Sequence, residues 1–431
     1  MNNKIKLAVA GAVLSAASVA NAGIIIPAGD WTLDVNGNVN AFATWSSYDG
    51  NDAGADTMAG SIFGAYGGLG PTDARLEDNT QGINTGLLPS WLGFTGTTRQ
   101  NDLDVSFTIS IQPNASDNFA TGDATVNSDA AGVTRAPLSR QAFVTFGDKS
   151  WGTVKLGKDL GIFASNAILN DMTLLGVGSA AGNSGNPTTT GGIGTGYIYA
   201  AWKGQIAYTT PNLNGFQATI GITNPNQASQ NDLFQDRFGY EAQANYSWTG
   251  DVSGKVWVGG ASYDMQLSEA AVTHVSVGAA PAAVSAMTDA DYSISAWDIG
   301  AQVSMGNLGL VAYYYDGKGL GTTFMGANGY DTANSKRRDS DGGYVQATYV
   351  IPTGTKLGVA YGRSNLDKAS GEADNVNLVD SNDRWTIGAY HPLTKHLNLV
   401  AEYNKTESES HNSAVEDWEN SSFSLGAILF F

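Results

Sequence analysis

Apolar and polar residues alternate with a period of two along much of the chain. In residues 102–112 the odd positions are leucine, valine, phenylalanine and isoleucine, whereas the even positions are aspartate, serine, threonine and glutamine. The same alternation recurs in residues 216–222, 238–248, 397–403 and 423–431. Alternation over about ten residues is typical of a transmembrane strand with one face toward lipid and the other toward water. Strands of a soluble β-sandwich also alternate, so the pattern alone predicts strands and not their setting.

Short and long connections alternate between these segments. Short turns at one end and long loops at the other are typical of outer-membrane barrels, whose turns face the periplasm and whose loops face outside. Counting the strands that they join predicts an all-β fold, a 16-stranded antiparallel transmembrane β-barrel. The turns are residues 98–101, 148–152, 210–215, 249–254, 305–309, 351–355 and 392–396, and the loops are residues 46–89, 113–138, 160–196, 224–237, 265–290, 316–341, 365–382 and 405–418.

Two predicted strands depart from the pattern. Residues 254–265 show only a weak period of two, and in residues 291–304 the apolar positions change from one face to the other. A β-bulge adds one residue to a strand and shifts its faces in this way. We therefore expect a bulge within residues 291–304.

Tyrosine and tryptophan recur near the ends of the predicted strands. A bilayer core offers no water to backbone amides, so a spanning sheet must close on itself. Aromatic residues then gather at the two membrane interfaces of such a barrel. The residues expected in these girdles are Trp45, Trp91, Trp202, Tyr208, Trp248, Trp297, Tyr349, Trp385 and Tyr403.

The first 22 residues have the three parts of a secretory signal peptide. Lys4 and Lys6 precede an apolar stretch over residues 7–20, and Ala20-Asn21-Ala22 is a small-x-small cleavage site. The apolar stretch is too short to span a bilayer as a helix, and a buried N-terminal helix is the alternative. We expect residues 1–22 to be cleaved and residues 23–431 to form the barrel.

The charge of the chain limits its partners. Formal net charge is −18, and there is no cysteine to form a disulfide. Nucleic-acid binding needs clustered lysine and arginine, so an acidic chain argues against it. Most of the acidic residues fall in the long connections, where they either solvate the loops or attract cations and divalent ions that bridge lipopolysaccharide. We expect no resident cofactor; loop-bound Ca²⁺ is a weaker prediction because no EF-hand spacing supports it.

Catalysis and a closed structural barrel are the rival functions. The four histidines, His274, His391, His396 and His411, fall in predicted loops or turns, and no hydrolase or metalloprotease motif is present. We therefore expect no enzyme. The predicted inward faces carry Ser, Thr, Asn, Gln and Asp, which would hydrate a lumen, so an open channel is favoured over a closed barrel.

Four segments resemble the general bacterial porins, a family of trimeric outer-membrane channels of Gram-negative bacteria. Residues 140–147 (RQAFVTFG) with residues 151–158 (WGTVKLGK) resemble a strand-turn-strand signature of that family, and residues 205–216 (QIAYTTPNLNGF) its next hairpin. Residues 423–431 (FSLGAILFF) resemble its terminal strand. Residues 90–96 (SWLGFTG) resemble an early strand that often carries Ser-Arg, and Trp91 stands here at the position of that arginine.

The resemblance implies that the third extracellular loop folds into the lumen and narrows it. The matching loop follows Lys158-Asp159 and runs to about Gly196. In the family, acidic residues on this loop face arginines and lysines on the wall. By position and parity, the residues expected at the constriction are Lys155, Lys203, Arg384, Arg140 and Lys356 on the wall, and Asp159 and Asp171 on the loop.

The resemblance also implies partners and a location. The chain would be exported to the Gram-negative outer membrane, lie among its lipid and lipopolysaccharide, and present Phe431 to the barrel-assembly machinery. It would form a homotrimer in which the second loop, residues 113–138, latches onto a neighbouring subunit. The first and last strands, residues 31–45 and 423–431, would lie at the trimer interface.

The expected function is passive diffusion of small hydrophilic solutes and ions, limited by size at the third loop. We expect weak cation preference, because the wall is thinly basic for the family and the inward carboxylates favour cations. The alternative is a substrate-selective porin for small organic acids, which would need a tight basic cluster at the constriction. The inward carboxylates are Asp34, Asp104, Glu241, Asp298 and Glu402.

Overall fold

The computed structural model describes most of the chain from residue 23 onward. The described residues are 23–50, 58–63, 79–113, 138–181, 188–224, 233–234, 237–267, 290–331 and 333–431. The predicted signal peptide and almost all of the predicted second loop lie outside these residues, so both stay predictions.

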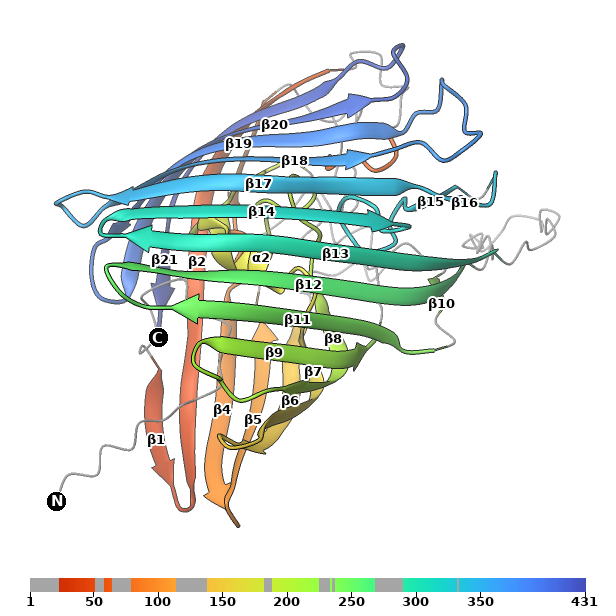
Figure 1. The fold of residues 1–431 in the computed structure, drawn as a ribbon. Coiled ribbons are helices and arrows are strands. Elements are labelled where there is room, and N and C mark those ends of the chain that lie inside the picture. Colours follow the sequence, from red (N-terminus) through yellow and green to blue (C-terminus); the bar gives the residue numbers. More distant parts are fainter. Residues whose placement is uncertain are drawn as a thin grey trace, which may run out of the picture.

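The chain forms one closed antiparallel sheet in which each wall strand pairs with its neighbours in sequence (Figure 1). The C-terminal part of β2, from Asn38 to Asp49, pairs with β21, and this pairing closes the barrel. β3 and β4 occupy one position beside β2, and β1 and β10 only extend the wall, so the sheet has the 16 positions that were predicted. The bounds are β1 Ile24–Ala28, β2 Trp31–Asp49, β3 Asn79–Asn84, β4 Trp91–Gln100, β5 Leu103–Gln112, β6 Leu138–Asp148, β7 Gly152–Leu160, β8 Trp202–Thr209, β9 Phe216–Thr223, β10 Leu233–Phe234, β11 Gly239–Trp248, β12 Val252–Leu267, β13 Ala290–Met305, β14 Leu308–Lys318, β15 Tyr330–Asp331, β16 Lys336–Arg337, β17 Asp339–Val350, β18 Lys356–Leu366, β19 Val379–Pro392, β20 Leu397–Ser410 and β21 Trp418–Phe430.

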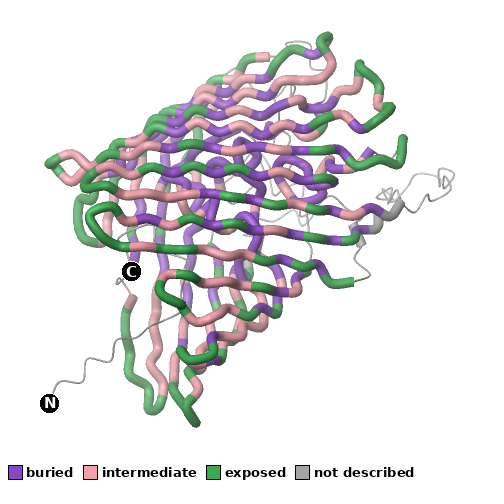
Figure 2. The backbone as a smooth tube through the Cα atoms, in the orientation of Figure 1, coloured by how far each residue is buried: buried purple, intermediate pink, exposed green. Residues whose placement is uncertain are grey.

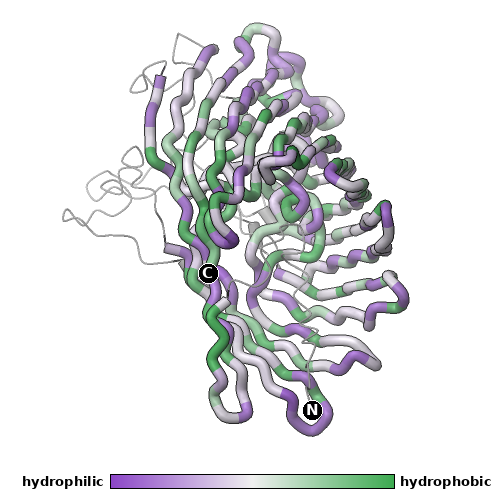
Figure 3. Tube along the Cα trace, turned by 90° about the vertical axis from the view of Figure 1, so that its left-hand side faces the viewer, coloured by the Kyte–Doolittle hydropathy of each residue, from purple (hydrophilic) through white to green (hydrophobic). Residues whose placement is uncertain are grey.

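The alternation along each strand separates an apolar outer face from an inner face that is mostly polar. On β20 and β21 the residues Leu399, Tyr403, Phe423 and Leu425 are exposed on the outside, whereas Val400, Glu402 and Ser424 on the opposite face are buried. Figure 3 shows apolar and polar positions alternating along the strands, and Figure 2 shows the same alternation as burial. Among the described residues, no helix is long and apolar enough to cross a membrane. The outer face of the wall exposes many apolar side chains, and such a surface is suited to lipid.

The predicted bulge in residues 291–304 is wrong. β12 and β13 pair without a register shift from Val252 opposite Met305 to Leu267 opposite Ala290. Tyr292 and Ile294 point to the same side as Asp298, which is the inside. The apparent change of face arises because the inner wall turns apolar where other segments pack on it. Register shifts occur instead at Ser110/Ile111 and at Val379/Ser381.

Several connections fold into the barrel, whereas only the third loop was expected to do so. Residues 58–63, 85–90, 161–201 and 319–331 are largely buried where they are described. They pack with inward residues of the wall into three apolar clusters, of which the largest includes Trp257, Tyr263 and Ile294. Figure 2 shows this buried material inside the sheet. Polar inward residues of β20 and β21, such as Thr406 and Ser422, are covered and not solvated.

Residues 85–90 leave the wall between β3 and β4. Two asparagine side chains on β2 make hydrogen bonds to their backbone in place of a neighbouring strand. The Asn38 side chain donates to the Pro89 carbonyl at 2.9 Å, and Asn40 donates to the Leu88 carbonyl at 2.9 Å. The Asn40 side-chain oxygen accepts from the Gly86 N–H at 2.9 Å. The buried backbone groups of this excursion are thus satisfied by side chains.

Six of the nine predicted girdle residues are exposed on the outer wall. They are Trp45, Tyr208, Trp297, Tyr349, Trp385 and Tyr403. Trp91 is only 6% exposed and lies on the inner side, so its assignment to a girdle is wrong. Trp91 and Trp202 instead pack against the Arg140 guanidinium.

Candidate functional site

The third loop enters the barrel after β7 and is held at its root by two inward carboxylates. The backbone N–H groups of Ile162 and Phe163 donate to Glu241 at 2.6 and 3.0 Å. The Ala164 N–H donates to Asp298 at 3.2 Å. A short helix follows, α2 (Ser165–Asn170), and then one 3₁₀ turn, η3 (Met172–Leu175). Wall carboxylates therefore fix the backbone of the loop as it turns inward.

The far part of the loop is fixed by the same chemistry. Val177 and Gly178 donate their N–H groups to Glu402 at 2.9 and 2.8 Å, and the Tyr390 hydroxyl donates to it at 2.7 Å. The Met172 N–H donates to the side-chain oxygen of Gln346 at 2.7 Å. Glu241, Asp298 and Glu402 lie inward as predicted, but they are buried anchors of the loop and not solvated charges.

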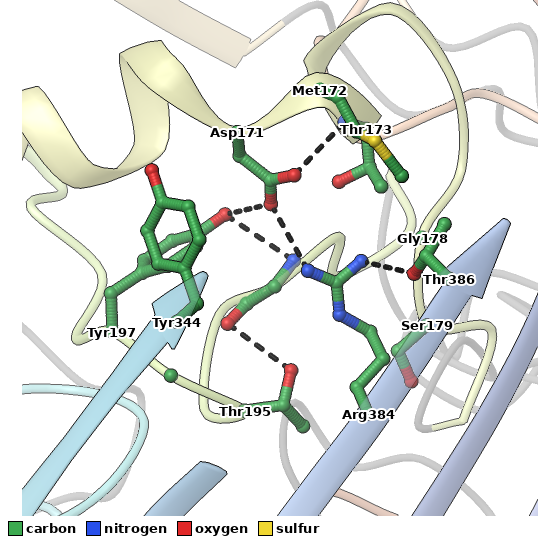
Figure 4. Close-up of polar contacts among 12 residues, drawn as sticks. Asp171, Met172, Thr173, Gly178, Ser179, Thr195, Tyr197, Tyr344, Arg384 and Thr386 are labelled. Carbon is green, nitrogen blue, oxygen red and sulfur yellow. Dashed lines mark hydrogen bonds and ion pairs between the residues drawn. The ribbon is translucent and has the colours of Figure 1, made fainter. Parts of the chain in front are cut away.

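Asp171 on the loop and Arg384 on β19 come together inside the barrel (Figure 4). Arg384 Nη2 lies 3.5 Å from Asp171 Oδ2, and both side chains are almost fully buried. Asp171 also accepts from the Tyr197 hydroxyl at 2.8 Å and from the Thr173 N–H at 2.9 Å. Arg384 Nη1 donates to Thr386 at 2.7 Å. Two predicted constriction residues thus form a direct contact and do not face each other across open space.

Tyr197 holds the loop at this point as a hydrogen-bond donor. Burial, together with the adjacent Asp171 carboxylate, raises the pKa of Tyr197 well above its ordinary value, so the hydroxyl keeps its proton. Its ring packs against that of Tyr344 with centroids 5.7 Å apart. The Tyr344 hydroxyl donates to the Ala167 carbonyl at 2.8 Å, which joins β17 to α2.

Two of the other predicted lysines, Lys155 and Lys203, also have acidic partners. Lys203 Nζ lies 2.6 Å from Glu241 in a buried pair that includes the Tyr263 hydroxyl. Lys155 contacts Asp159, and its side chain is partly exposed. Asp159 belongs to β7, so its predicted place on the loop is wrong. Lys203 and Asp159 are both buried on the inner face of the wall, where their strands pair with each other.

The Arg140 guanidinium is packed between two tryptophan rings and does not face open space. Its guanidinium lies 4.7 Å from the ring centroid of Trp91 and 4.1 Å from that of Trp202, and it donates to Gln141 at 2.9 Å. The residue sits beside the register shift between β5 and β6. Stacking between two indoles stabilises the buried cation and joins β4, β6 and β8.

Lys255 is the functional candidate that sequence reasoning missed. Its strand, β12, was the one with a weak period, because Trp257 and Tyr263 also face inward. Lys255 Nζ donates to the Asn166 side chain on α2 at 2.6 Å. Lys356 lies 5.0 Å from the Tyr390 ring centroid. Among the described residues, neither ammonium forms an ion pair with a carboxylate.

Lys155, Lys255 and Lys356 together form a set that we call the basic belt. All three lie near the short turns, on β7, β12 and β18, and their contacts with Asp159, Asn166 and Tyr390 place them on the inner face of the wall. Each is partly exposed, in contrast to the buried anchors above. The arrangement places positive charge where a solute could meet it.

One acidic cluster lies at the opposite end of the barrel. Carboxylate oxygens of Glu407, Glu409 and Asp417 lie within 4.8 Å of one another. Burial and the charge of Glu409 raise the pKa of Asp417. Carboxylates at this spacing fit a hard cation such as Ca²⁺, but exposed acidic groups are common without one, so the predicted loop Ca²⁺ stays a prediction.

Comparisons with known proteins agree with this architecture. A family model described as Gram-negative porin matches residues 7–411. A search of curated proteins finds no match. Among solved structures, the outer membrane channel DcaP of Acinetobacter baumannii has a TM-score of 0.61 at 14% identity, covering 95% of this chain and 100% of that one. The anion-selective porin from Comamonas acidovorans has a TM-score of 0.56 at 14% identity, covering 93% and 100%. A trimer form of Vibrio cholerae OmpT has a TM-score of 0.53 at 15% identity, covering 93% and 99%.

Proposed function

The chain belongs to the Gram-negative porin family, and from this premise we propose that it forms a channel for passive diffusion of small hydrophilic solutes and ions. It is an outer-membrane channel and not an enzyme. The observation that carries the proposal is a closed wall with an apolar outer face and a partly exposed polar inner face. Polar residues of this inner face, toward the short turns, include Thr95, Thr108 and Thr145. Size exclusion would act at the third loop, where Asp171 and Arg384 meet.

Liposome swelling tests passive diffusion directly. Vesicles containing the folded protein should swell in sugars and amino acids at rates that fall steeply with solute size, because the loops fill much of the barrel. Protein-free vesicles and vesicles with a closed structural barrel should not swell. Absence of swelling with correctly folded protein would contradict the proposal.

Two finer proposals concern selectivity. The acidic loops and the inward carboxylates supported weak cation preference. The contacts favour the second candidate, a preference for anions that includes small organic acids. Glu241, Asp298 and Glu402 are buried and each accepts from backbone N–H groups of the third loop, whereas the basic belt is partly exposed and Lys255 and Lys356 lack carboxylate partners among the described residues.

Competition experiments separate these candidates. If the basic belt binds organic acids, then a small dicarboxylate added to one side should reduce the single-channel current, whereas an uncharged sugar of the same size should not. A cation-preferring channel would show no such block. Block that survives replacement of all three belt lysines would point to another site.

The remaining family features are proposals of the same kind. We propose that residues 1–22 are a cleaved signal peptide, that residues 23–431 form the mature barrel, and that three copies assemble with β2 and β21 near the interface. Lipid and lipopolysaccharide would surround the trimer. Cross-linking of the native membrane should yield a species three times the mass of the chain; a monomer only would contradict the homotrimer.

A further inference from the structure

The connection between β14 and β17 places a second segment over the third loop. We call residues 319–331 the cover segment. Leu320 and Met325 are buried in the same apolar cluster as Tyr197 and Ile198 of the third loop. The Thr322 hydroxyl reaches the Gly60 carbonyl at 3.4 Å. The cover segment is therefore part of the packing inside the barrel.

Arg338 closes the cover segment at its base. Its Nη1 donates to the carbonyls of Asn328 and Tyr330 at 2.8 and 3.1 Å. Its backbone N–H donates to the Gly329 carbonyl at 2.8 Å, and its own carbonyl accepts from the Gly319 N–H at 2.9 Å. One residue thus binds both ends of the segment.

The other edge of the Arg338 guanidinium binds Glu372 in the connection between β18 and β19. Nε and Nη2 donate to the two carboxylate oxygens at 3.0 and 2.5 Å, which is a forked geometry. The two side chains are only 10% and 6% exposed. Glu372 is also held by the Ala369 N–H at 2.8 Å. A buried, forked pair of this kind is strongly coupled to its surroundings, because removing one partner leaves the other charge unpaired.

A chain of contacts joins the cover segment to the constriction. The Tyr199 N–H donates to the Thr323 carbonyl at 2.9 Å. The rings of Tyr199 and Phe324 pack edge to face with centroids 5.8 Å apart. Two residues earlier, Tyr197 donates to Asp171, which contacts Arg384. The last part of the third loop thus lies between the cover segment and the Asp171–Arg384 contact.

We propose that Arg338 is a positioning residue of the channel: through its pair with Glu372 it holds the cover segment against the third loop and so sets the size of the constriction. The inference rests on the proposed channel function. We call the Arg338–Glu372 pair the latch. The inference concerns this pair alone, because neither Arg338 nor Glu372 takes part in the contacts between Asp171, Arg384 and the wall.

Single-channel recording of Glu372→Gln and Arg338→Met tests the latch. Glu372→Gln is the milder change, since glutamine keeps the shape and one acceptor oxygen. Each variant should occupy a higher-conductance, noisier state about tenfold more often than the wild type, because charge-assisted hydrogen bonds are lost. The double variant should show no more than the larger single effect, since both changes break one contact.

Arg363→Met is the matched control. Arg363 pairs with Asp383 and Glu409 on the outer face of the same barrel end, so its loss should leave conductance unchanged. Arg338→Lys keeps the charge but loses the fork and should give an intermediate effect. If the wild type conducts and the folded latch variants match its conductance and noise, the inference is overturned. If the wild type itself does not conduct, the channel function fails first.

Hydrogen exchange supplies a second readout. A pair that only stabilised the whole barrel would not change the protection of one particular amide. The Tyr199 amide should lose protection in Glu372→Gln while amides of β19 and β20 keep theirs. Unchanged protection at Tyr199 would contradict the latch even if the variant unfolds at a lower temperature.

Discussion

The buried carboxylates of Asp171 and Glu402 each have several partners inside the barrel. Asp171 has Arg384, the Tyr197 hydroxyl and the Thr173 N–H, and Glu402 has two backbone N–H groups and the Tyr390 hydroxyl. Such groups are costly when a single partner is removed, because the remaining charge stays buried. At the residue scale, the constriction is therefore a rigid polar network, and its charges are unavailable to passing ions.

Arg384→Met should destabilise the barrel by about 3 kcal/mol, since it leaves Asp171 buried without its cation. Urea unfolding in lipid vesicles measures the change. Arg99→Met serves as the control, because Arg99 forms exposed pairs with Asp104 and Asp148 and its loss should not be measurable. An equal effect of the two substitutions would contradict the burial argument.

Lys255→Met should lower the ratio of chloride to potassium permeability by roughly a factor of two, because one unpaired charge of the basic belt is removed. The reversal potential in a salt gradient measures the ratio. Lys149→Met removes a lysine from an exposed turn outside the lumen and should leave the ratio unchanged. If Lys149→Met changed the permeability ratio and Lys255→Met did not, the basic belt would not be the source of the selectivity.

At the scale of elements, the third loop and the cover segment behave as one packed unit. The loop is anchored to β11, β13 and β20 by carboxylates, and the cover segment is anchored to the β18–β19 connection by Arg338 and Glu372. Elements held by a few polar contacts open more readily than the wall, whose backbone is paired on both sides. Opening and closing of the channel is therefore expected in the third loop and the cover segment, and not in the wall.

The latch should respond to acid. Burial opposes ionisation of Glu372, but hydrogen bonds from Arg338 and Ala369 outweigh it and hold the pKa of Glu372 below its ordinary value of 4.5. A depressed pKa stabilises the folded latch above pH 4.5, and this contribution is lost as the pH falls through the folded pKa. The noisy state should therefore become more populated as the pH falls below 4.5, and Glu372→Gln should lack this step. A wild type with unchanged noise in this range would contradict the assignment.

At the scale of the whole molecule, the strands were predictable and the interior was not. Turns such as residues 210–215 and 351–355 stand where the alternation placed them, because lipid outside and water inside impose a period of two. Where inner segments pack on the wall, the inward residues become apolar and the period fades. This explains the missed Lys255 on β12 and the false bulge near Tyr292 on β13. The Arg384–Asp171 contact was within reach of sequence reasoning through a family resemblance, whereas the Arg338–Glu372 pair had no local signal.

The C-terminus closes the barrel and gives a prediction for assembly. Phe431 exchanges two backbone hydrogen bonds with Gly37, at 2.8 and 3.0 Å. If the assembly machinery reads this aromatic residue, then Phe431→Ala should reduce the folded barrel recovered from the outer membrane. Folding of the same variant into detergent in vitro should be nearly normal, because the backbone bonds do not need the side chain. Equal losses in both settings would indicate a defect in folding and not in recognition.

The most direct test of the account is a single-channel recording of the wild type in a planar bilayer under a potassium chloride gradient. The account predicts stepwise openings, grouped in threes, with a reversal potential of the sign set by chloride, because the lysines of the basic belt are partly exposed whereas Glu241, Asp298 and Glu402 are buried against the third loop. A reversal potential set by potassium would contradict the role of the basic belt. Folded protein that produces no steps would contradict the channel itself.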